Sequence, residues 1–329
     1  PFVVSRVSQF PILLYELTDR DVEQGLESKV ELQERLDTEL ARLPEADLEG
    51  GMDVLRTFKH SATLKVAMLE LLDLVPTMKA SDQLTAIAEV VLGQSVVLAA
   101  RYLVERHGLP SNASGEADTV NFGVIAYGKL GGVELGYGSD LDVVFVFDAH
   151  PSGATLGARP IDNRVFYNRL GQRLVHIMTS LTRFGTLYEL DLRLRPDGNS
   201  SPLVVSVSSY EKYLQDSAWT WEIQALVRAR FVAGSPLLAA HFKQIRSQAL
   251  EQSRDAGELL KDVLSMREKM RQHLNTNTQP LDAAHRQASC IHTSTHIDTA
   301  TLVSINKYTQ PAGPPCRSWS GFVSGAADA

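Results

Sequence analysis

The chain has 329 residues, of which 44% are hydrophobic and 22% charged, an ordinary globular composition with room for two or three domains. Its formal net charge of −7 argues against nucleic acid as the main partner, because binding to a phosphate backbone needs a basic face. We expect no membrane-spanning segment and no signal peptide, and therefore a cytoplasmic protein. Because the chain begins with Pro1 rather than Met, we also expect an internal piece of a longer protein.

Residues 1–110 are predicted to form a helical segment, because apolar residues recur at spacings of three and four. One apolar stripe ends before Pro76, and a second ends at Gly108 and Pro110, with Ser81 as its expected N-cap. The stripe residues are Leu55, Phe58, Val66 and Leu69, followed by Leu84, Ile87, Val91, Leu98 and Tyr102. Both stripes are interpreted as core, and residues 111–119 as a polar linker.

The next stretch reads GVIAYGKLGGVELGYGSDLDVVFVFD and carries the clearest chemistry. An apolar strand over residues 124–127 enters a glycine loop, and a strand over residues 141–147 opens with Asp140 and Asp142. Side chains two apart on a strand point to one face, so the two carboxylates project together. The two carboxylates raise each other's pKa unless a cation neutralises them. The glycines of the loop let backbone N–H groups approach phosphate oxygens closely. This combination predicts a Mg²⁺ site beside a bound phosphate group.

Other interpretations of this stretch are weaker. The plain alternative is a strand end at the surface with two solvated aspartates. The spacing from Gly123 to Lys129 matches a P-loop by count, but Leu130 stands where a metal-binding Ser or Thr belongs, and no Rossmann glycine motif is present.

Residues 151–160, PSGATLGARP, are predicted to form a flexible loop that acts as a lid. A helix is expected to follow and to end at Gly185. His176 lies beside the apolar stripe of that helix and is interpreted as a packed or exposed residue rather than a catalytic one.

Residues 186–195 alternate apolar with charged side chains and are predicted to form a strand. If this strand lies beside the one that opens with Asp140, Asp191 completes a cluster of three carboxylates. Arg193 and Arg195 can then meet phosphate oxygens in bidentate geometry. The alternative is an amphipathic edge strand with paired surface charges.

The run SAWTWEIQALVRARFVAG is predicted to be a helix whose tryptophans pack in a core. Glu222, Arg228 and Arg230 are its candidates for contact with a nucleotide or a target protein. Helix is expected to continue over residues 237–274.

Residues 276–329 have few charges and no sustained periodicity, so we expect a disordered or aberrant tail. The cysteines and histidines in it lack the paired spacing of a zinc site. These residues are Cys290, His292, His296 and Cys316.

The run AYGKLGGVELGYGSDLDVVFVFD closely resembles the nucleotidyltransferase signature of the glutamine synthetase adenylyltransferase family. These bifunctional enzymes attach AMP to glutamine synthetase and remove it. Further segments agree in the same order, namely VPTMKASDQLT, LYELDLRLRPDGNSSPLV, AWTWEIQALVRAR and MREKMRQHL. The resemblance covers roughly residues 8–274, and TWEIQALVRAR looks more like the family's AMP-adding half than its AMP-removing half.

The resemblance implies an α+β fold with a polymerase-β-like nucleotidyltransferase domain, a small mixed sheet with helices on one side, over residues 120–215. Helical segments would flank this domain. They are residues 1–110, before the linker, and residues 216–275, which would begin a truncated helical domain.

The resemblance also implies transfer of AMP from ATP to a tyrosine of glutamine synthetase, with release of diphosphate. Asp140 and Asp142 would bind Mg²⁺, and Asp191 would bind metal or act as a base. The residues that would line the triphosphate are Lys129, Gly131, Gly132 and Ser139. Control by glutamine and by a signal-transducing regulatory protein is implied as well.

Three alternatives stay open. The first is phosphorolytic removal of AMP from the same tyrosine, which needs the same metal site. The second is a non-catalytic fragment that only binds partners. The third is a nucleotidyltransferase acting on nucleic acid, which the acidic charge balance disfavours.

Overall fold

The computed structural model describes residues 25–44 and 47–252, and beyond them positions 257, 261, 264, 265 and 268. The chain divides into two compact units, Pro1–Ala249 and Leu250–Ala329. The described part of the first unit is a mixed α+β structure, as the sequence predicts. Both the expected tail, with its cysteines, and most of the helix expected beyond residue 252 lie outside the described residues.

The described chain opens with three helices. They are α4 (Lys29–Leu40), α5 (Leu48–Leu71) and α6 (Thr77–His107). Ser28 begins α4 with a capping box, in which its Oγ accepts from the Glu31 backbone N–H at 3.2 Å and Glu31 accepts in return at 2.7 Å. The predicted apolar stripes are confirmed as core, since their residues are buried or half-buried in α5 and α6. Gly108, at φ +79°, ends α6 as expected.

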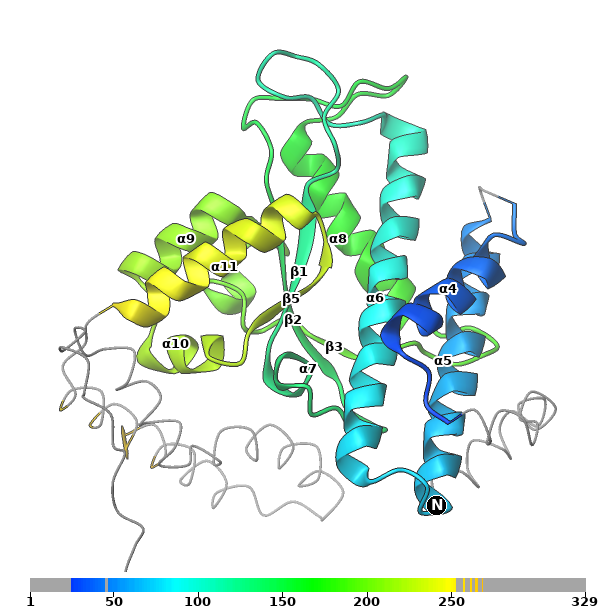
Figure 1. Ribbon diagram of the computed structural model, residues 1–329. Helices are drawn as coiled ribbons and strands as arrows, with labels where there is room; N and C mark the ends of the chain where they lie inside the picture. Colours follow the sequence, from blue (N-terminus) through cyan, green and yellow to red (C-terminus); the bar gives the residue numbers. More distant parts are fainter. Residues whose placement is uncertain are drawn as a thin grey trace, which may run out of the picture. The chain divides into compact units, whose positions relative to one another are not determined.

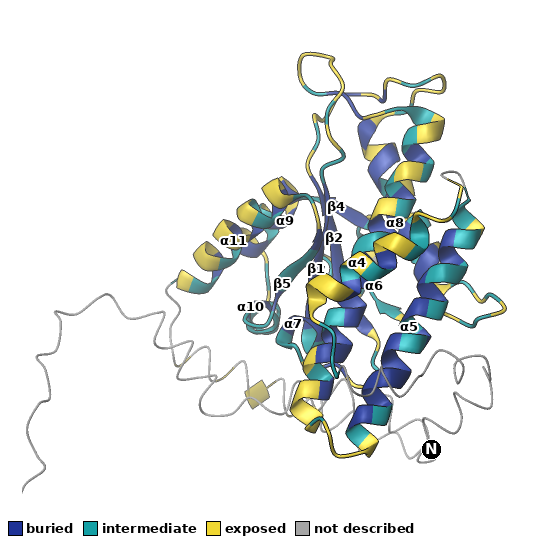
Figure 2. Ribbon diagram, turned by 45° about the vertical axis from the view of Figure 1, so that its right-hand side comes forward, coloured by how far each residue is buried: buried dark blue, intermediate teal, exposed yellow. Residues whose placement is uncertain are grey.

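One expectation about α6 is wrong. Its N-cap is Pro76 rather than Ser81, whose hydroxyl instead donates to the Leu135 carbonyl at 3.0 Å. By length and composition, α6 is also long and apolar enough to cross a membrane, with a mean hydropathy of 1.6 over its most apolar window. Of that window 56% is buried, because α6 packs against α4, α5, α8 and β5. That is the environment of a core helix (Figure 2).

The sheet has five short strands of mixed direction. They are β1 (Phe122–Ala126), β2 (Leu141–Phe147), β3 (Leu190–Asp191), β4 (Val204–Ser206) and β5 (Arg230–Gly234). Their order is β3-β2-β1-β5, and β4 also pairs with β2. β1 is antiparallel to both β2 and β5, while β2 is parallel to β3 and β4. The small mixed sheet is therefore confirmed.

Helices cover both faces of this sheet, rather than the one face that the family resemblance implies. Four further helices take part, namely α8 (Asn163–Thr179), α9 (Val207–Asp216), α10 (Thr220–Leu226) and α11 (Pro236–Glu251). In Figure 1, α4, α5, α6 and α8 lie on one side of the strands and α9, α10 and α11 on the other. Val143 and Phe145 join the core with α6 and α8. Val144 and Val146 are equally buried, and by alternation they point to the other face.

Arg56 joins α5 to the end of α8 from a fully buried position. Its guanidinium donates to four backbone carbonyls, those of Met52 at 2.8 Å, Ile177 at 2.9 Å, Ser180 at 2.7 Å and Gly185 at 2.8 Å. A buried charge costs free energy unless it is hydrogen-bonded, and here the backbone supplies the acceptors. α5 and α8 are thereby tied together at this point.

Residues 217–234 do not form the single predicted helix. The chain leaves α10 at Leu226, turns, and forms β5 on the otherwise unpaired edge of β1, with Ala126 opposite Arg230. Gly123 makes room for this strand, because a Cβ there would lie 2.4 Å from the Phe231 ring. Pairing with a sheet edge outweighed the local helical pattern.

The predicted strand over residues 186–195 is much shorter in the structure. Only Leu190–Asp191 pairs with β2, because β4 takes the later part of the same edge, with Val204 opposite Phe145. α8 also ends earlier than predicted, at Thr179. Gly185 lies instead in a turn, where its N–H donates to the Thr182 carbonyl at 2.9 Å.

Residues 151–160 are not placed to act as a lid over Asp140. They follow the end of β2, whereas Asp140 precedes its start. The loop is held beside the end of α6, where the Leu156 N–H donates to the Leu109 carbonyl at 2.9 Å. Gly157 packs directly against Gly108, since a Cβ on Gly108 would lie 2.3 Å from the Gly157 nitrogen.

Candidate active site

Three aspartates meet where β2 begins, and we call Asp140, Asp142 and Asp191 the acidic cluster. Asp140 immediately precedes β2, and Asp142 is its second residue. β3 runs parallel to this end of β2 with Asp142 opposite Asp191, and the Leu141 N–H donates to the Glu189 carbonyl at 3.0 Å. Residues opposite each other on neighbouring strands point to the same face. The structure thus brings together the three carboxylates singled out in the sequence.

Asp142 is the electrostatically strained member of the acidic cluster. Burial raises the pKa of its carboxyl to about 6, and the charges of Asp140 and Asp191 act in the same direction. The positive charges of Arg193 and Lys129 oppose this shift without cancelling it. Negative charge is therefore in excess around Asp142, and a bound cation would relieve it.

Asp191 is held by Arg193, two residues further along the chain. The Arg193 backbone N–H donates to Asp191 Oδ1 at 2.9 Å, and its Nε donates to Oδ2 at 2.8 Å. Burial raises the pKa of Asp191, but the hydrogen bonds and charge of Arg193 outweigh it, so the pKa lies below its ordinary value. Arg193, expected at phosphate oxygens, thus contacts a carboxylate here.

These donors fit a divalent cation bound by two carboxylates. Across residues 25–44 and 47–252, no three His, Cys, Asp or Glu side chains are gathered tightly enough to hold a metal ion. Mg²⁺ is commonly held by one or two carboxylates, with waters and substrate phosphates completing its shell. Asp140 and Asp142 meet that requirement, whereas Asp191 would first have to release Arg193.

The predicted glycine loop is a five-residue helix, α7 (Gly128–Gly132), with Tyr127 as its N-cap. The Tyr127 N–H donates to the Asp142 carbonyl at 2.9 Å. Gly128 has φ +53°, and a Cβ there would lie 2.1 Å from Asp142 Oδ2. Only glycine fits this position, which the sequence motif alone did not single out. Lys129 follows directly, and its charge lowers the pKa of Asp142.

The other residues expected to line a triphosphate are less clearly placed for it. Gly131 is buried, and its N–H donates to the Tyr127 carbonyl at 2.8 Å. Gly132 is half-buried. The Ser139 hydroxyl accepts from the Gly136 N–H at 3.0 Å, and Arg195 donates to the Leu192 carbonyl at 2.6 Å. Their contact with a phosphate stays a prediction.

The tryptophan and arginine motif contacts α7, since Gly131 lies against the Arg228 carbonyl, and it is held by internal contacts. Glu222 accepts from the Tyr213 hydroxyl at 2.8 Å and from the Trp219 N–H at 2.8 Å. Arg228 pairs with Glu134, and Arg230 pairs with Glu89 on α6. The sequence interpretation missed Glu89, although an isolated carboxylate in the apolar run AIAEVVLG is a signal for a buried ion pair.

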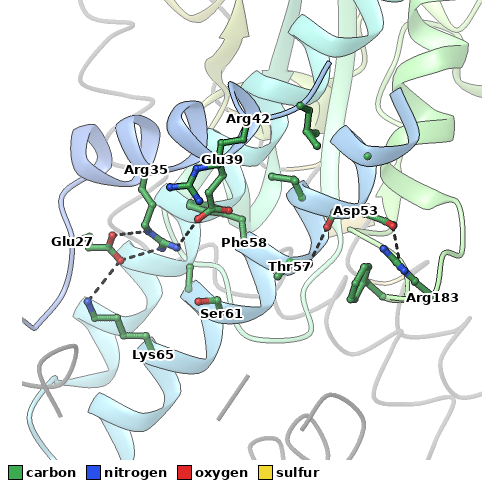
Figure 3. Close-up of a pocket in the computed structure, with 15 residues that line it drawn as sticks. Glu27, Arg35, Glu39, Arg42, Asp53, Thr57, Phe58, Ser61, Lys65 and Arg183 are labelled. Atoms are coloured by element: carbon green, nitrogen blue, oxygen red, sulfur yellow. Dashed lines mark hydrogen bonds and ion pairs between the residues drawn. The ribbon is translucent and has the colours of Figure 1, made fainter. Parts of the chain in front are cut away.

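A separate cavity of about 820 Å³ lies between α4, α5 and the turn at Arg183, and we call it the α4–α5 groove (Figure 3). Several of its charged side chains pair with one another. Arg35 Nε lies 2.9 Å from Glu27, Lys65 Nζ 3.8 Å from Glu27, and Arg183 Nε 3.1 Å from Asp53. None of the residues that line it belongs to the acidic cluster or to α7.

The protein-family model described as "Glutamate-ammonia ligase adenylyltransferase" matches residues 1–245. Three similar curated proteins are each named "Bifunctional glutamine synthetase adenylyltransferase/adenylyl-removing enzyme". The one from Pseudomonas putida is 45% identical over 276 residues, which cover 84% of this chain and 28% of the relative. The one from Idiomarina loihiensis is 46% identical over 274 residues, covering 83% and 29%. The one from Pseudomonas aeruginosa is 42% identical over 327 residues, covering 98% and 32%. The chain thus spans less than a third of the length of these relatives.

Proposed function

Because the chain belongs to the glutamate-ammonia ligase adenylyltransferase family, we propose that its acidic cluster transfers AMP from ATP to a tyrosine of glutamine synthetase. The observation that carries the proposal is the gathering of Asp140, Asp142 and Asp191 where β2 begins. α7 packs directly against Asp142 at that point.

In this proposal the tyrosine oxygen forms a bond to the α-phosphorus of ATP, and the bond from that phosphorus to the bridging oxygen breaks. Diphosphate leaves with the electron pair of that bond. Mg²⁺, held by Asp140 and Asp142, would neutralise the negative charge of the phosphates. Lys129 lies close enough to lower the pKa of Asp142, and in this proposal it contacts a phosphate oxygen beside that carboxylate.

Asp191 and Arg193 have complementary roles in the proposal. The Arg193 side chain is 68% exposed, so it can turn from Asp191 to a phosphate oxygen. Once Arg193 has turned away, the Asp191 carboxylate accepts the proton of the attacking hydroxyl or serves as a further metal ligand.

The test is incubation of the chain with unmodified glutamine synthetase, Mg²⁺ and ATP labelled on the α-phosphate. We expect label on glutamine synthetase with the wild-type chain and a loss of about a thousandfold or more in the Asp140→Asn, Asp142→Asn double variant. Normal labelling by the double variant would contradict the assignment of the acidic cluster.

The reverse reaction is the second candidate, because the relatives' printed name covers adenylyl removal as well as transfer. The same carboxylates serve both directions. Loss of labelled AMP from adenylylated glutamine synthetase on addition of inorganic phosphate, with no gain of label from ATP, would assign this chain to removal. Binding of glutamine synthetase without either reaction would indicate a fragment that only binds its partner.

A regulatory protein partner and control by glutamine remain predictions from the family resemblance, and a cytoplasmic location remains a prediction from the sequence. Binding of a signal-transducing regulatory protein is checked by co-purification with the chain, in the presence and absence of glutamine. The charge of −7 continues to disfavour nucleic acid as a substrate.

A further inference from the structure

Arg230 holds the C-terminal end of α7 from the neighbouring strand. It is the first residue of β5 and lies opposite Ala126, the last residue of β1. Its Nε donates to the Gly131 carbonyl at 2.7 Å and its Nη2 to the Leu130 carbonyl at 2.9 Å. The last carbonyls of a helix lack partners inside the helix, and a guanidinium satisfies two of them in one plane.

Glu89 fixes the orientation of that guanidinium. Its side chain is only 7% exposed in the middle of α6, and its Oε1 accepts from Arg230 Nη2 at 2.5 Å. Its second oxygen, Oε2, pairs with Lys29 at the start of α4. A carboxylate this deeply buried needs both charge and hydrogen-bond partners, so Glu89 and Arg230 hold each other in place.

The same α7 touches the acidic cluster on its other side. Gly128 lies against Asp142 so closely that a methyl group would not fit, and the Tyr127 N–H donates to the Asp142 carbonyl. Gly131 lies against the Arg228 carbonyl, where a Cβ would be 2.4 Å away. α7 is therefore clamped between Asp142 and the segment that carries Arg230, and its position depends on both.

We propose that Glu89 and Arg230 form a positioning pair that fixes α7 against Asp142, and through α7 sets the affinity of the site for the triphosphate of Mg²⁺-ATP. This inference rests on the proposed function. Neither residue touches the substrate. Arg230 acts through the carbonyls of α7, and Glu89 acts through Arg230.

The variants that test the pair are Arg230→Lys and Glu89→Gln. Lysine keeps the positive charge but cannot reach two carbonyls and a carboxylate in one plane. Glutamine keeps the shape of Glu89 and removes its charge. Two matched controls change residues that do not contact α7. Lys29→Gln removes the other partner of Glu89, and Arg246→Lys disrupts a guanidinium that donates to the Leu226 and Val227 carbonyls at the end of α10.

The first readout is hydrogen exchange of the α7 amides in the nucleotide-free chain, because it does not depend on activity. The reporters are the Gly131 N–H, bonded to the Tyr127 carbonyl, and the Glu134 N–H, bonded to the Lys129 carbonyl. In both test variants we expect these amides to exchange about tenfold faster, with unchanged exchange in β1 and β2, and no change at α7 in the controls.

The second readout is equilibrium binding of Mg²⁺-ATP, followed by kcat at saturating nucleotide. We expect Kd to rise about tenfold in both test variants while kcat falls less than about threefold. A circular dichroism melt checks folding, and if Arg230→Lys does not fold, Glu89→Gln carries the test.

Unchanged exchange at α7 in a folded test variant would overturn the proposal, and so would faster exchange with an unchanged Kd. Failure of the wild-type chain to bind Mg²⁺-ATP would instead refute the proposed function. The exchange data would then still decide whether Glu89 and Arg230 hold α7.

Discussion

The α4–α5 groove and the acidic cluster are both rich in charge, yet they distribute it differently. In the groove, Arg35, Lys65 and Arg183 each pair with a carboxylate of the same cavity. In the acidic cluster three carboxylates converge, and their repulsion adds to burial in raising the pKa of Asp142. Charges that the fold pairs internally stabilise helix packing, whereas like charges held together indicate a ligand of opposite sign.

Among the predictions that test this comparison, the largest change in stability is expected from substitution of Gly128, where α7 contacts the acidic cluster. Gly128→Ala should lower the free energy of unfolding by about 2–4 kcal/mol, because the new methyl meets Asp142 Oδ2 and the residue keeps a positive φ. Chemical denaturation measures this loss.

Gly115→Ala is the matched control, since Gly115 also has a positive φ, of +79°, but a Cβ there meets nothing within 4 Å. It should cost only about 1 kcal/mol, the strain of the backbone alone. Equal losses in the two variants would mean that α7 does not press against Asp142.

A smaller change in stability, a gain rather than a loss, is expected from Asp142→Asn. The pKa of Asp142 is about 6 in the folded chain, above its ordinary value, so wild-type stability falls as pH rises from about 4 to about 6 and stays lowered above that. The variant cannot ionise. At pH 7.5 without Mg²⁺ it should therefore be more stable than wild type by about 1–3 kcal/mol, and the gain should vanish near pH 4.

Thermal melts across this pH range check the prediction, and melts with added Mg²⁺ extend it. Mg²⁺ should raise the Tm of the wild type and leave that of Asp142→Asn nearly unchanged. A variant that is less stable than wild type at pH 7.5 would show that negative charge is not in excess at this position.

The smallest change in stability is expected from substitutions in the α4–α5 groove. The Arg183 side chain is 76% exposed, so its pair with Asp53 should contribute about 0.5 kcal/mol or less. A double-mutant cycle with Arg183→Gln and Asp53→Asn measures this coupling, and AMP transfer should be unchanged in all three variants. A loss of transfer would place the groove in the catalytic machinery and remove the contrast with the acidic cluster.

The acidic cluster was predictable because its members follow local rules. Asp140 and Asp142 lie two apart at the start of an apolar strand, and the alternation around Asp191 predicted a strand that completes the cluster if it lies beside them. The stripes of α5 and α6 were equally local, since spacings of three and four define a helix face.

What could not be predicted depends on competition between distant segments. β3 is short because β4 occupies the rest of the edge of β2, and residues 230–234 form a strand because β1 has an edge to fill. The contact of Arg193 with Asp191 and the tight approach of Gly128 to Asp142 are set by side-chain packing. No spacing in the sequence records them.

The four hydrogen bonds of Arg56 bear on how the region around the acidic cluster could be transferred to another protein by design. A transplanted piece that began at β1 would leave the carbonyls of Ile177, Ser180 and Gly185 without the donor that α5 provides. The smallest portable piece therefore includes α5, although that helix contributes no residue to the acidic cluster. Through Arg56, α5 and the end of α8 would have to be transferred together.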